Sequence, residues 1–262
     1  MENKKSIWGK YELKNGENFQ FEGGRTLVFV RRLTNGWMIS GKTQNEISNQ
    51  LAFEACEPFQ PTGDEAIFQT GRSEVLHVQP ALPLKPVVLR NNKTINVSPK
   101  QSIKLYLAIP LNVQFYYSQA DEEHLMHEVS LDILSDTWFG ESDNGEPAFS
   151  IGQRVSLSPE DLELKKHEAF CPVKINNNSN HLLELQRLII RVENLSLYQT
   201  HNQFITSRLS IDFKGPDQIS NLDFSTDKSI HGDHPVLLAK ARNPVTKTIL
   251  GKSFYFIKHL TQ

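Results

Sequence analysis

The chain has 262 residues and carries 28 Lys and Arg against 30 Asp and Glu, a formal net charge of -2 at pH 7. This balance argues against a protein that binds nucleic acid or an anionic membrane surface, because such proteins normally have a basic excess. Hydrophobic residues make up 38% of the chain and charged residues 22%. That is enough apolar material for a packed core, so disorder over most of the length is excluded.

The N-terminus has positive charge but no apolar stretch behind it, so we expect no secretory signal peptide. Apolar runs such as residues 27–30 and 236–239 are far shorter than the roughly 20 residues of a membrane-spanning helix. We therefore expect a cytoplasmic protein with no membrane insertion. Cys56 and Cys171 lie far apart in sequence, which favours two reduced buried thiols over a disulfide framework.

A β-hairpin is predicted near the N-terminus. Residues 26–33 are rich in β-branched and aromatic side chains, and residues 37–40 resume the apolar character. Between them, Asn35 and Gly36 are two residues that tolerate a positive φ, which is the strongest short-range hairpin signal.

Alternating apolar residues predict further strands with one buried face. The alternation runs through residues 103–109, resumes after Pro110 over residues 113–117, and returns at residues 209–213. Residues 254–257 form one more β-prone segment at the end of the chain.

Residues 180–195 are ambiguous. Their leucines fit a helical stripe, or a strand that has a bulge near Gln186 and Arg187. The preceding residues 173–175 resemble a strand that enters the Asn-rich turn 176–180, which favours a hairpin continuing into Leu182.

Many short strands separated by turns, with few credible long helices, predict an all-β protein with sandwich-like packing. Residues 79–86 contain three prolines and are the best candidate linker. We therefore predict a small N-terminal β domain over residues 1–84 and a β-sandwich-like domain over residues 85–262.

Three segments carry a resemblance to a known family: Ser135–Gly140, Cys171–Ile175 and Leu188–Tyr198. They resemble the domain of unknown function 432 family, a set of uncharacterised, mostly prokaryotic proteins. The resemblance is best over residues 80–215. It implies extended structure for residues 182–192 and supplies no catalytic residues.

Residues 36–43 match the pattern of a phosphate-binding loop. In such a loop backbone N–H groups surround the phosphates and a lysine reaches the terminal phosphate. Thr43 and Glu46 would cap the helix that must follow. Against this hypothesis, the bulky residues 37–39 are typical of a strand, and no strand ending in a magnesium-binding aspartate is evident. A nucleotide site would use Gly36, Gly41, Lys42 and Thr43.

Two histidine pairs are candidate metal ligands. Imidazole and carboxylate groups suit zinc or another divalent ion. On a regular strand, however, His124 and His127 would point to opposite faces. The second pair lies in a turn-like stretch, where a loop can bring both rings together. The candidate ligands are His231, Asp233, His234, His124 and His127.

An acidic segment with two aromatic residues is the first place to look for a ligand site. An aromatic platform beside carboxylates suits a carbohydrate, a cation or a basic peptide. The competing interpretation is structural: Trp138 anchors the loop on the core while the aspartates accept turn hydrogen bonds. The candidate residues are Asp136, Trp138, Phe139, Glu141, Asp143 and Glu146.

We therefore expect a non-enzymatic module that binds a small molecule or an unidentified protein, without nucleic acid. A metal-dependent hydrolase built on the histidines and carboxylates is the alternative, and nucleotide binding at residues 36–43 is a third. The sequence contains no Gly-x-Ser-x-Gly or Cys-x-x-Cys motif. We predict no cofactor, apart from the divalent metal of the alternative, and note that an exposed β edge would allow a homodimer.

Overall fold

The computed structural model describes residues 6–60, 63–119, 122–140, 142–143, 145–200, 203–215, 220–232 and 234–243. The strands are β1 (Gly9–Glu12), β2 (Asn18–Leu33), β3 (Gly36–Ala55), β4 (Ala66–Gln69), β5 (Val75–Ala81), β6 (Val87–Val97), β7 (Ser102–Pro110), β8 (Asn112–Gln119), β9 (Glu122–Ser130), β10 (Ser135–Phe139), β11 (Glu146–Ser150), β12 (Val155–Ser156), β13 (Glu168–Asn177), β14 (Leu183–Ile190), β15 (Leu197–Gln199), β16 (Phe204–Thr206), β17 (Arg208–Phe213), β18 (Asn221–Ser225) and β19 (Val236–Ala239).

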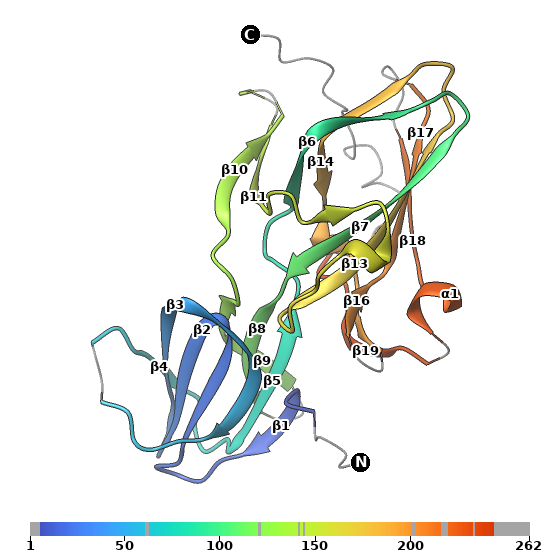
Figure 1. Cartoon of the computed structure of the whole chain (residues 1–262). Helices are drawn as coiled ribbons and strands as arrows, with labels where there is room; N and C mark the ends of the chain where they lie inside the picture. The colour runs from blue at the N-terminus through green and yellow to red at the C-terminus, as the bar shows by residue number, and fades with distance from the viewer. Residues whose placement is uncertain are drawn as a thin grey trace. The chain divides into compact units, whose positions relative to one another are not determined.

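Over the described ranges, helical structure is confined to short pieces: the helix α1 (Lys228–His231) and the 3₁₀ turns η1 (Pro159–Asp161) and η2 (Val192–Asn194). The predicted all-β class is therefore confirmed (Figure 1). Among the residues that the structure describes, no helix is long and apolar enough to cross a membrane. Both cysteines are free; Cys171 is buried and Cys56 is half-buried.

Residue contacts group the chain into two compact units. The first takes in residues up to 81, 110–133 and 165–167, and the second takes in residues 82–109, 134–164 and those from 168 on. Each unit is thus made of separate chain segments, whereas the sequence predicts two continuous domains that meet at residue 84. The candidate linker also begins inside structure, because Pro80 belongs to β5 and pairs with Val113 of β8.

The first unit contains two sheets, one with the order β1-β5-β8-β9 and one with the order β2-β3-β4. Aromatic rings connect them. Phe115 of β8 lies 6.2 Å from Phe21 of β2 and 6.4 Å from Phe53 of β3, between ring centroids. All three rings are buried, and pairs in this distance range add to the stabilisation from burial alone.

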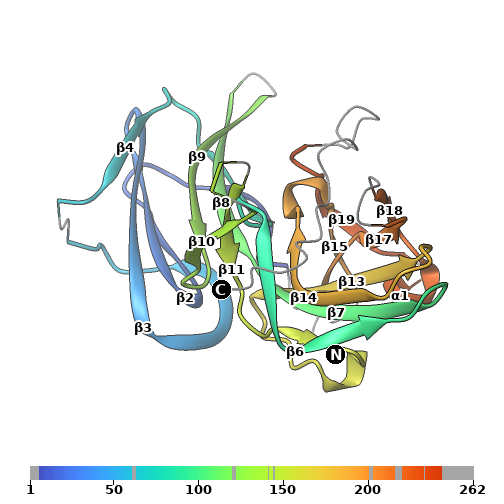
Figure 2. The same cartoon turned by 90° about the horizontal axis from the view of Figure 1, so that it is seen from above.

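The predicted hairpin is β2 and β3, which pair from Phe19 with Ala55 to Leu33 with Gly36, with register shifts between Gly23 and Thr26 (Figure 2). Its turn, however, is Thr34–Asn35, because Leu33 already pairs with Gly36. Neither Asn35 nor Gly36 has a positive φ. The expectation that the glycine serves a turn with positive φ was therefore wrong. Gly36 is required by close packing: a Cβ atom there would lie 1.9 Å from the carbonyl oxygen of Phe68 in β4.

The helix that the phosphate-loop hypothesis requires after Thr43 is not formed, because β3 continues to Ala55. Gly41, Lys42 and Thr43 pair with Val28, Leu27 and Thr26 as ordinary strand residues. A phosphate-binding loop needs a strand, a loop and then a helix N-terminus. Residues 36–43 therefore lack the geometry on which the nucleotide hypothesis depends.

In the second unit, one sheet has the order β10-β11-β6-β14. The structure resolves the ambiguity at residues 180–195 in favour of a strand, β14, whose register with β6 shifts between Leu185 and Arg187. This is the predicted bulge, and it lets Leu183, Leu185 and Leu188 all reach the core. The expected hairpin was wrong, since β14 pairs with β6 while β13 pairs with β16 and β17.

The other sheet of the second unit has the order β12-β7-β13-β16-β15-β19, with β17 pairing β13 and β18 pairing β17. Its strands show the predicted period of two. Leu105 and Leu107 of β7 and Ile175 of β13 are at most 1% exposed. The residues between them point to the opposite face of the sheet, where the candidate site lies.

Candidate functional site

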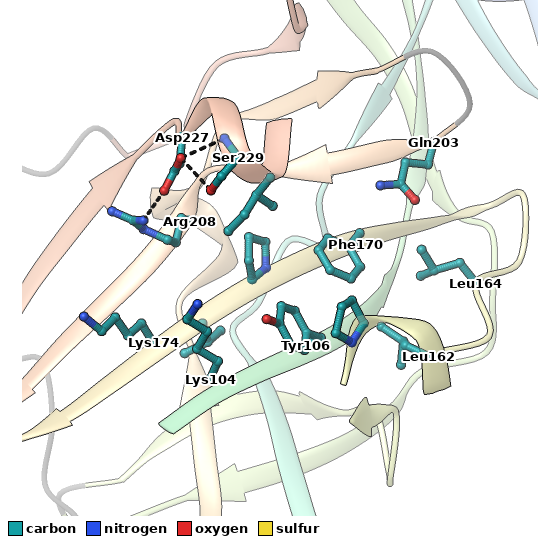
Figure 3. Close-up of a pocket in the computed structure, with 14 residues that line it drawn as sticks. Lys104, Tyr106, Leu162, Leu164, Phe170, Lys174, Gln203, Arg208, Asp227 and Ser229 are labelled. Carbon is teal, nitrogen blue, oxygen red and sulfur yellow. Dashed lines mark hydrogen bonds and ion pairs between the residues drawn. The ribbon is translucent and has the colours of Figure 1, made fainter. Parts of the chain in front are cut away.

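A pocket of about 450 Å³ lies on one face of the larger sheet of the second unit (Figure 3). Its volume falls within the usual range of small-molecule sites. We call it the β7–β13 pocket. It is lined by Lys104, Tyr106, Pro159, Leu162, Leu164, Phe170, Pro172, Val173, Lys174, Gln203, Arg208, Asp227, Ser229 and Ile230.

The strand repeat places the pocket's main side chains on one face. Lys104 and Tyr106 are two residues apart on β7, and Phe170 and Lys174 are four apart on β13, the next strand in the sheet. Side chains separated by an even number of strand residues share a face. Arg208 begins β17, which pairs with β13, so adjacent strands supply the floor of the pocket.

The centre of the floor is aromatic. The rings of Tyr106 and Phe170 stack with centroids 5.4 Å apart and planes 21° apart. Figure 3 shows Leu162 and Leu164, from the segment after η1, beside these rings at one end of the pocket. This end and the ring stack together form an apolar wall.

The opposite end is cationic. In Figure 3 the amino groups of Lys104 and Lys174 extend to the same side of the ring stack, and the guanidinium of Arg208 lies toward that side as well. Within the described chain, neither lysine forms an ion pair with a carboxylate. Arg208 does: its Nη1 lies 2.5 Å from an oxygen of Asp227. The pocket therefore has an apolar part and a part with uncompensated positive charge.

Asp227 is the only acid among the described residues that line the pocket. It is the N-cap of α1 and accepts hydrogen bonds from the backbone N–H of Ser229 at 2.9 Å and from its hydroxyl at 2.8 Å. These bonds from Ser229, together with the charge of Arg208, lower the pKa of Asp227 below its usual value. Its carboxylate is thus held ionised and is already bound to its neighbours.

His231 fixes α1 against the sheet. It is 2% exposed; its Nε2 lies 2.7 Å from the carbonyl oxygen of Thr206, and its Nδ1 accepts from the backbone N–H of Asp227 at 3.1 Å. Both ring nitrogens are therefore engaged by the backbone. His234 is exposed, and Asp233 lies outside the described residues. A metal site at this pair, as the alternative hypothesis requires, is not favoured.

The other histidine pair lies in the first unit, on β9. Its register with β8 shifts between Phe115 and Tyr116, so His127 pairs with Phe115 and His124 with Tyr117. The bulge thereby puts both histidines on one face, contrary to the expectation for a regular strand. Burial lowers the pKa of His127. Within the described residues, neither histidine pair belongs to a group of three side chains that could hold a metal ion.

The buried acids near the end of β9 and the start of β13 have cationic partners. In the first unit, Asp132 lies within 4.8 Å of a ring nitrogen of His167, and its oxygen is 3.6 Å from Nε of Arg25. In the second unit, Glu168 is 3.0 Å from Nη1 of Arg154. Because each carboxylate already has a guanidinium partner, we assign both to the fold.

The acidic aromatic segment is the hairpin of β10 and β11. Trp138 is 46% exposed whereas Phe139 is buried, so the expected anchoring role falls to Phe139. Asp136 pairs with Lys85 at 2.7 Å, and Glu146 pairs with Arg191.

Asp143 is exposed in the turn of this hairpin, and Glu141 lies outside the described residues. Two of the hairpin's carboxylates are already paired with basic side chains, which lowers the negative charge that the hairpin offers to a cationic ligand. The structure does not bring this segment and the candidate histidines into one described pocket.

Cys171 lies on β13 between Phe170 and Pro172 but is fully buried. Burial raises the pKa of its thiol from 9.0 to about 12. Below pH 9 the thiol is neutral in both the folded and unfolded chain; above pH 9 only the unfolded chain ionises readily. We predict that Cys171 lowers the free energy of unfolding by about 1.4 kcal/mol per pH unit between pH 9 and 12. Urea unfolding at several pH values, compared with Cys171→Ala, measures this contribution, and parallel pH profiles of the two proteins would contradict it.

None of the residues of the β7–β13 pocket was a candidate from sequence. Lys104, Tyr106 and Lys174 occupy the polar phase of strands, which is also the pattern of a solvated face. The residue types on these strands did carry a signal. Lys104 and Tyr106 lie two residues apart on β7, and Phe170 and Lys174 lie four apart on β13. Together they form a surface that is both apolar and cationic. The segments that contribute Leu162 and Ser229 to the pocket show no hydrophobic periodicity in the sequence from which their position could be predicted.

Comparison with known proteins adds the family but no activity. Neither the search of curated proteins nor the search of solved structures found a match. The family model described as "Protein of unknown function (DUF432)" matches residues 7–258, which extends well beyond the part of the chain where the resemblance was expected to be best. The chain therefore belongs to the DUF432 family of proteins of unknown function.

Proposed function

We propose that this protein is a ligand-binding module whose β7–β13 pocket takes a small amphipathic anion. The observation that carries the proposal is the combination in one pocket of an apolar wall and a cationic end. Tyr106 and Phe170 provide the wall, and Lys104 and Lys174 provide positive charge without a carboxylate partner in the described chain. Charged groups attract a ligand from solution and orient it, while the apolar wall adds affinity through burial.

Binding without catalysis is the better interpretation of this pocket. General acid–base catalysis needs a group whose pKa lies near the working pH. Among the described lining residues the single acid is Asp227, which has a lowered pKa and is bound to Ser229 and Arg208. His231, the nearest histidine in sequence, has both ring nitrogens engaged by backbone groups.

Titration calorimetry with 1-naphthalenesulfonate tests the proposal, because this probe combines an aromatic body with one negative charge. We expect saturable binding at one site. Leu164→Asn, which places a polar group on the apolar wall, should weaken it about tenfold, since fully burying a leucine side chain contributes about 1.5–3 kcal/mol.

The matched control is Leu157→Asn. Leu157 is 60% exposed and does not line the pocket, so this variant should bind the probe like the native protein. Absence of saturable binding, or equal loss in the two variants, would contradict the proposed function.

A further inference from the structure

The charge at the cationic end of the β7–β13 pocket indicates the charge of its ligand. Arg208 and Asp227 form an ion pair and largely cancel one another. Lys104 and Lys174 have no such carboxylate among the described residues. Two positive charges are therefore left for a ligand to neutralise. A monoanion would compensate only one of them, whereas a dianion compensates both.

The cationic groups also come from three adjacent strands. Lys104 is on β7, Lys174 is on β13, and Arg208 begins β17, with β13 in the middle of the three. Arg208 uses Nη1 for Asp227 and Nη2 for the hydroxyl of Ser225 at 3.2 Å, while its Nε–H has no acceptor in the described chain. Three cationic side chains around one end of a pocket match an acceptor with three terminal oxygens.

A phosphate monoester has both properties. It carries about two negative charges above its second pKa near 6 and presents three terminal acceptor oxygens. A carboxylate has one charge and two oxygens, and a sulfonate has three oxygens but only one charge. Inorganic phosphate has no apolar group that could lie against the stacked rings of Tyr106 and Phe170, so the ligand should also carry an organic group.

We propose that the natural ligand of the β7–β13 pocket is a small phosphate monoester with an apolar body. Its phosphate lies between Lys104 and Lys174 near Arg208, and its body lies against Tyr106 and Phe170. This inference rests on the proposed function and specifies the chemical class of its ligand.

The test compares ligands that share one body, using calorimetry on the full chain. At pH 8, 1-naphthyl phosphate should bind at least about tenfold more tightly than 1-naphthalenesulfonate, because of its second charge. Inorganic phosphate should bind at least about tenfold more weakly than the naphthyl ester.

The pH dependence provides an independent readout. Lowering the pH from 8 to 5 converts the ester to a monoanion, so the advantage of the phosphate over the sulfonate should shrink severalfold. The sulfonate keeps one charge throughout, and its own pH profile therefore reports any titration of the protein.

Asp227→Asn gives a gain of binding. Asparagine retains an oxygen that caps α1 but removes the charge that neutralises Arg208. The affinity for 1-naphthyl phosphate should rise severalfold in this variant. The control Glu184→Gln removes the same charge from an exposed acid of β14, in the other sheet of the second unit and outside the pocket, and should leave the affinity unchanged.

The failures are distinguishable. Equal affinity for the two naphthyl ligands at pH 8, or an advantage that persists unchanged at pH 5, would overturn the phosphate assignment while leaving the amphipathic pocket intact. If inorganic phosphate binds as tightly as the ester, the claim that the ligand has an apolar body is wrong. If neither naphthyl ligand binds, the proposed function fails as well.

Discussion

Replacing Lys104 and Lys174 together by glutamine is expected to raise the Kd for 1-naphthalenesulfonate at least about tenfold. Each hydrogen bond to a charged group contributes about 1.5–3 kcal/mol, and 1.4 kcal/mol corresponds to a factor of ten; the exposure of Lys104 lowers its share through solvent screening. Both side chains lie at the surface end of the pocket, so the free energy of unfolding should change by less than about 0.5 kcal/mol.

The control for this variant must match its change in net charge. Lys214 and Lys240 are exposed lysines of the second unit that do not line the pocket. Their double replacement by glutamine alters the overall charge by the same amount and should leave the Kd unchanged. Similar weakening in both double variants would show that the probe responds to overall charge, and the assignment of the cationic end would then be wrong.

The largest expected effect on stability comes from Gly36→Ala. A Cβ atom at this position would lie 1.9 Å from the carbonyl oxygen of Phe68, so β4 must move away from β3. We expect the free energy of unfolding to fall by about 3 kcal/mol or more, at the upper end of the range for overpacking. Urea unfolding measures the change.

Gly41→Ala is the informative comparison, because Gly36 and Gly41 are the two glycines of the phosphate-loop pattern. A Cβ atom at Gly41 would meet only Nε2 of His127, at an ordinary 3.7 Å. This variant should therefore be nearly neutral, within about 0.5 kcal/mol. A neutral Gly36→Ala would contradict the close pairing of β3 with β4 at Phe68. Strong destabilisation by Gly41→Ala would contradict the open space described beside Gly41.

The strands were predictable where one face of a sheet is buried. The period of two at residues 103–109 and 209–213 follows directly from burial of alternate side chains, and the bulge near Gln186 is the only way for a strand to bury Leu183, Leu185 and Leu188 together. These predictions depend on local sequence alone. They were correct because local pattern and tertiary packing agree there.

The errors arose where the partner of a segment decides its structure. A glycine after Asn35 is typical of a turn, but here the approach of β4 requires it. The phosphate-loop hypothesis requires a helix after Thr43, yet Thr43, Ser48 and Leu51 pair with β2 and the segment stays extended. Likewise, β13 and β14 follow one another in sequence but pair in different sheets. Such long-range pairings are not encoded in short windows of sequence.

The candidate site was missed for the same reason. Lys104, Phe170 and Arg208 are far apart in sequence and become neighbours only through the order of β7, β13 and β17. The acidic hairpin was conspicuous in sequence because its charges are contiguous, but Lys85 and Arg191 neutralise two of them from distant segments. Contiguity of charge in a sequence is thus a poor guide to net charge at a folded surface.

A crystal structure of the protein with 1-naphthyl phosphate is the most direct test of the claim that the β7–β13 pocket binds an amphipathic anion. We predict that the naphthyl ring lies against Tyr106 and Phe170 and that the phosphate lies between the amino groups of Lys104 and Lys174. An empty β7–β13 pocket at a ligand concentration that saturates the protein in solution, with the ligand bound elsewhere, would contradict the account.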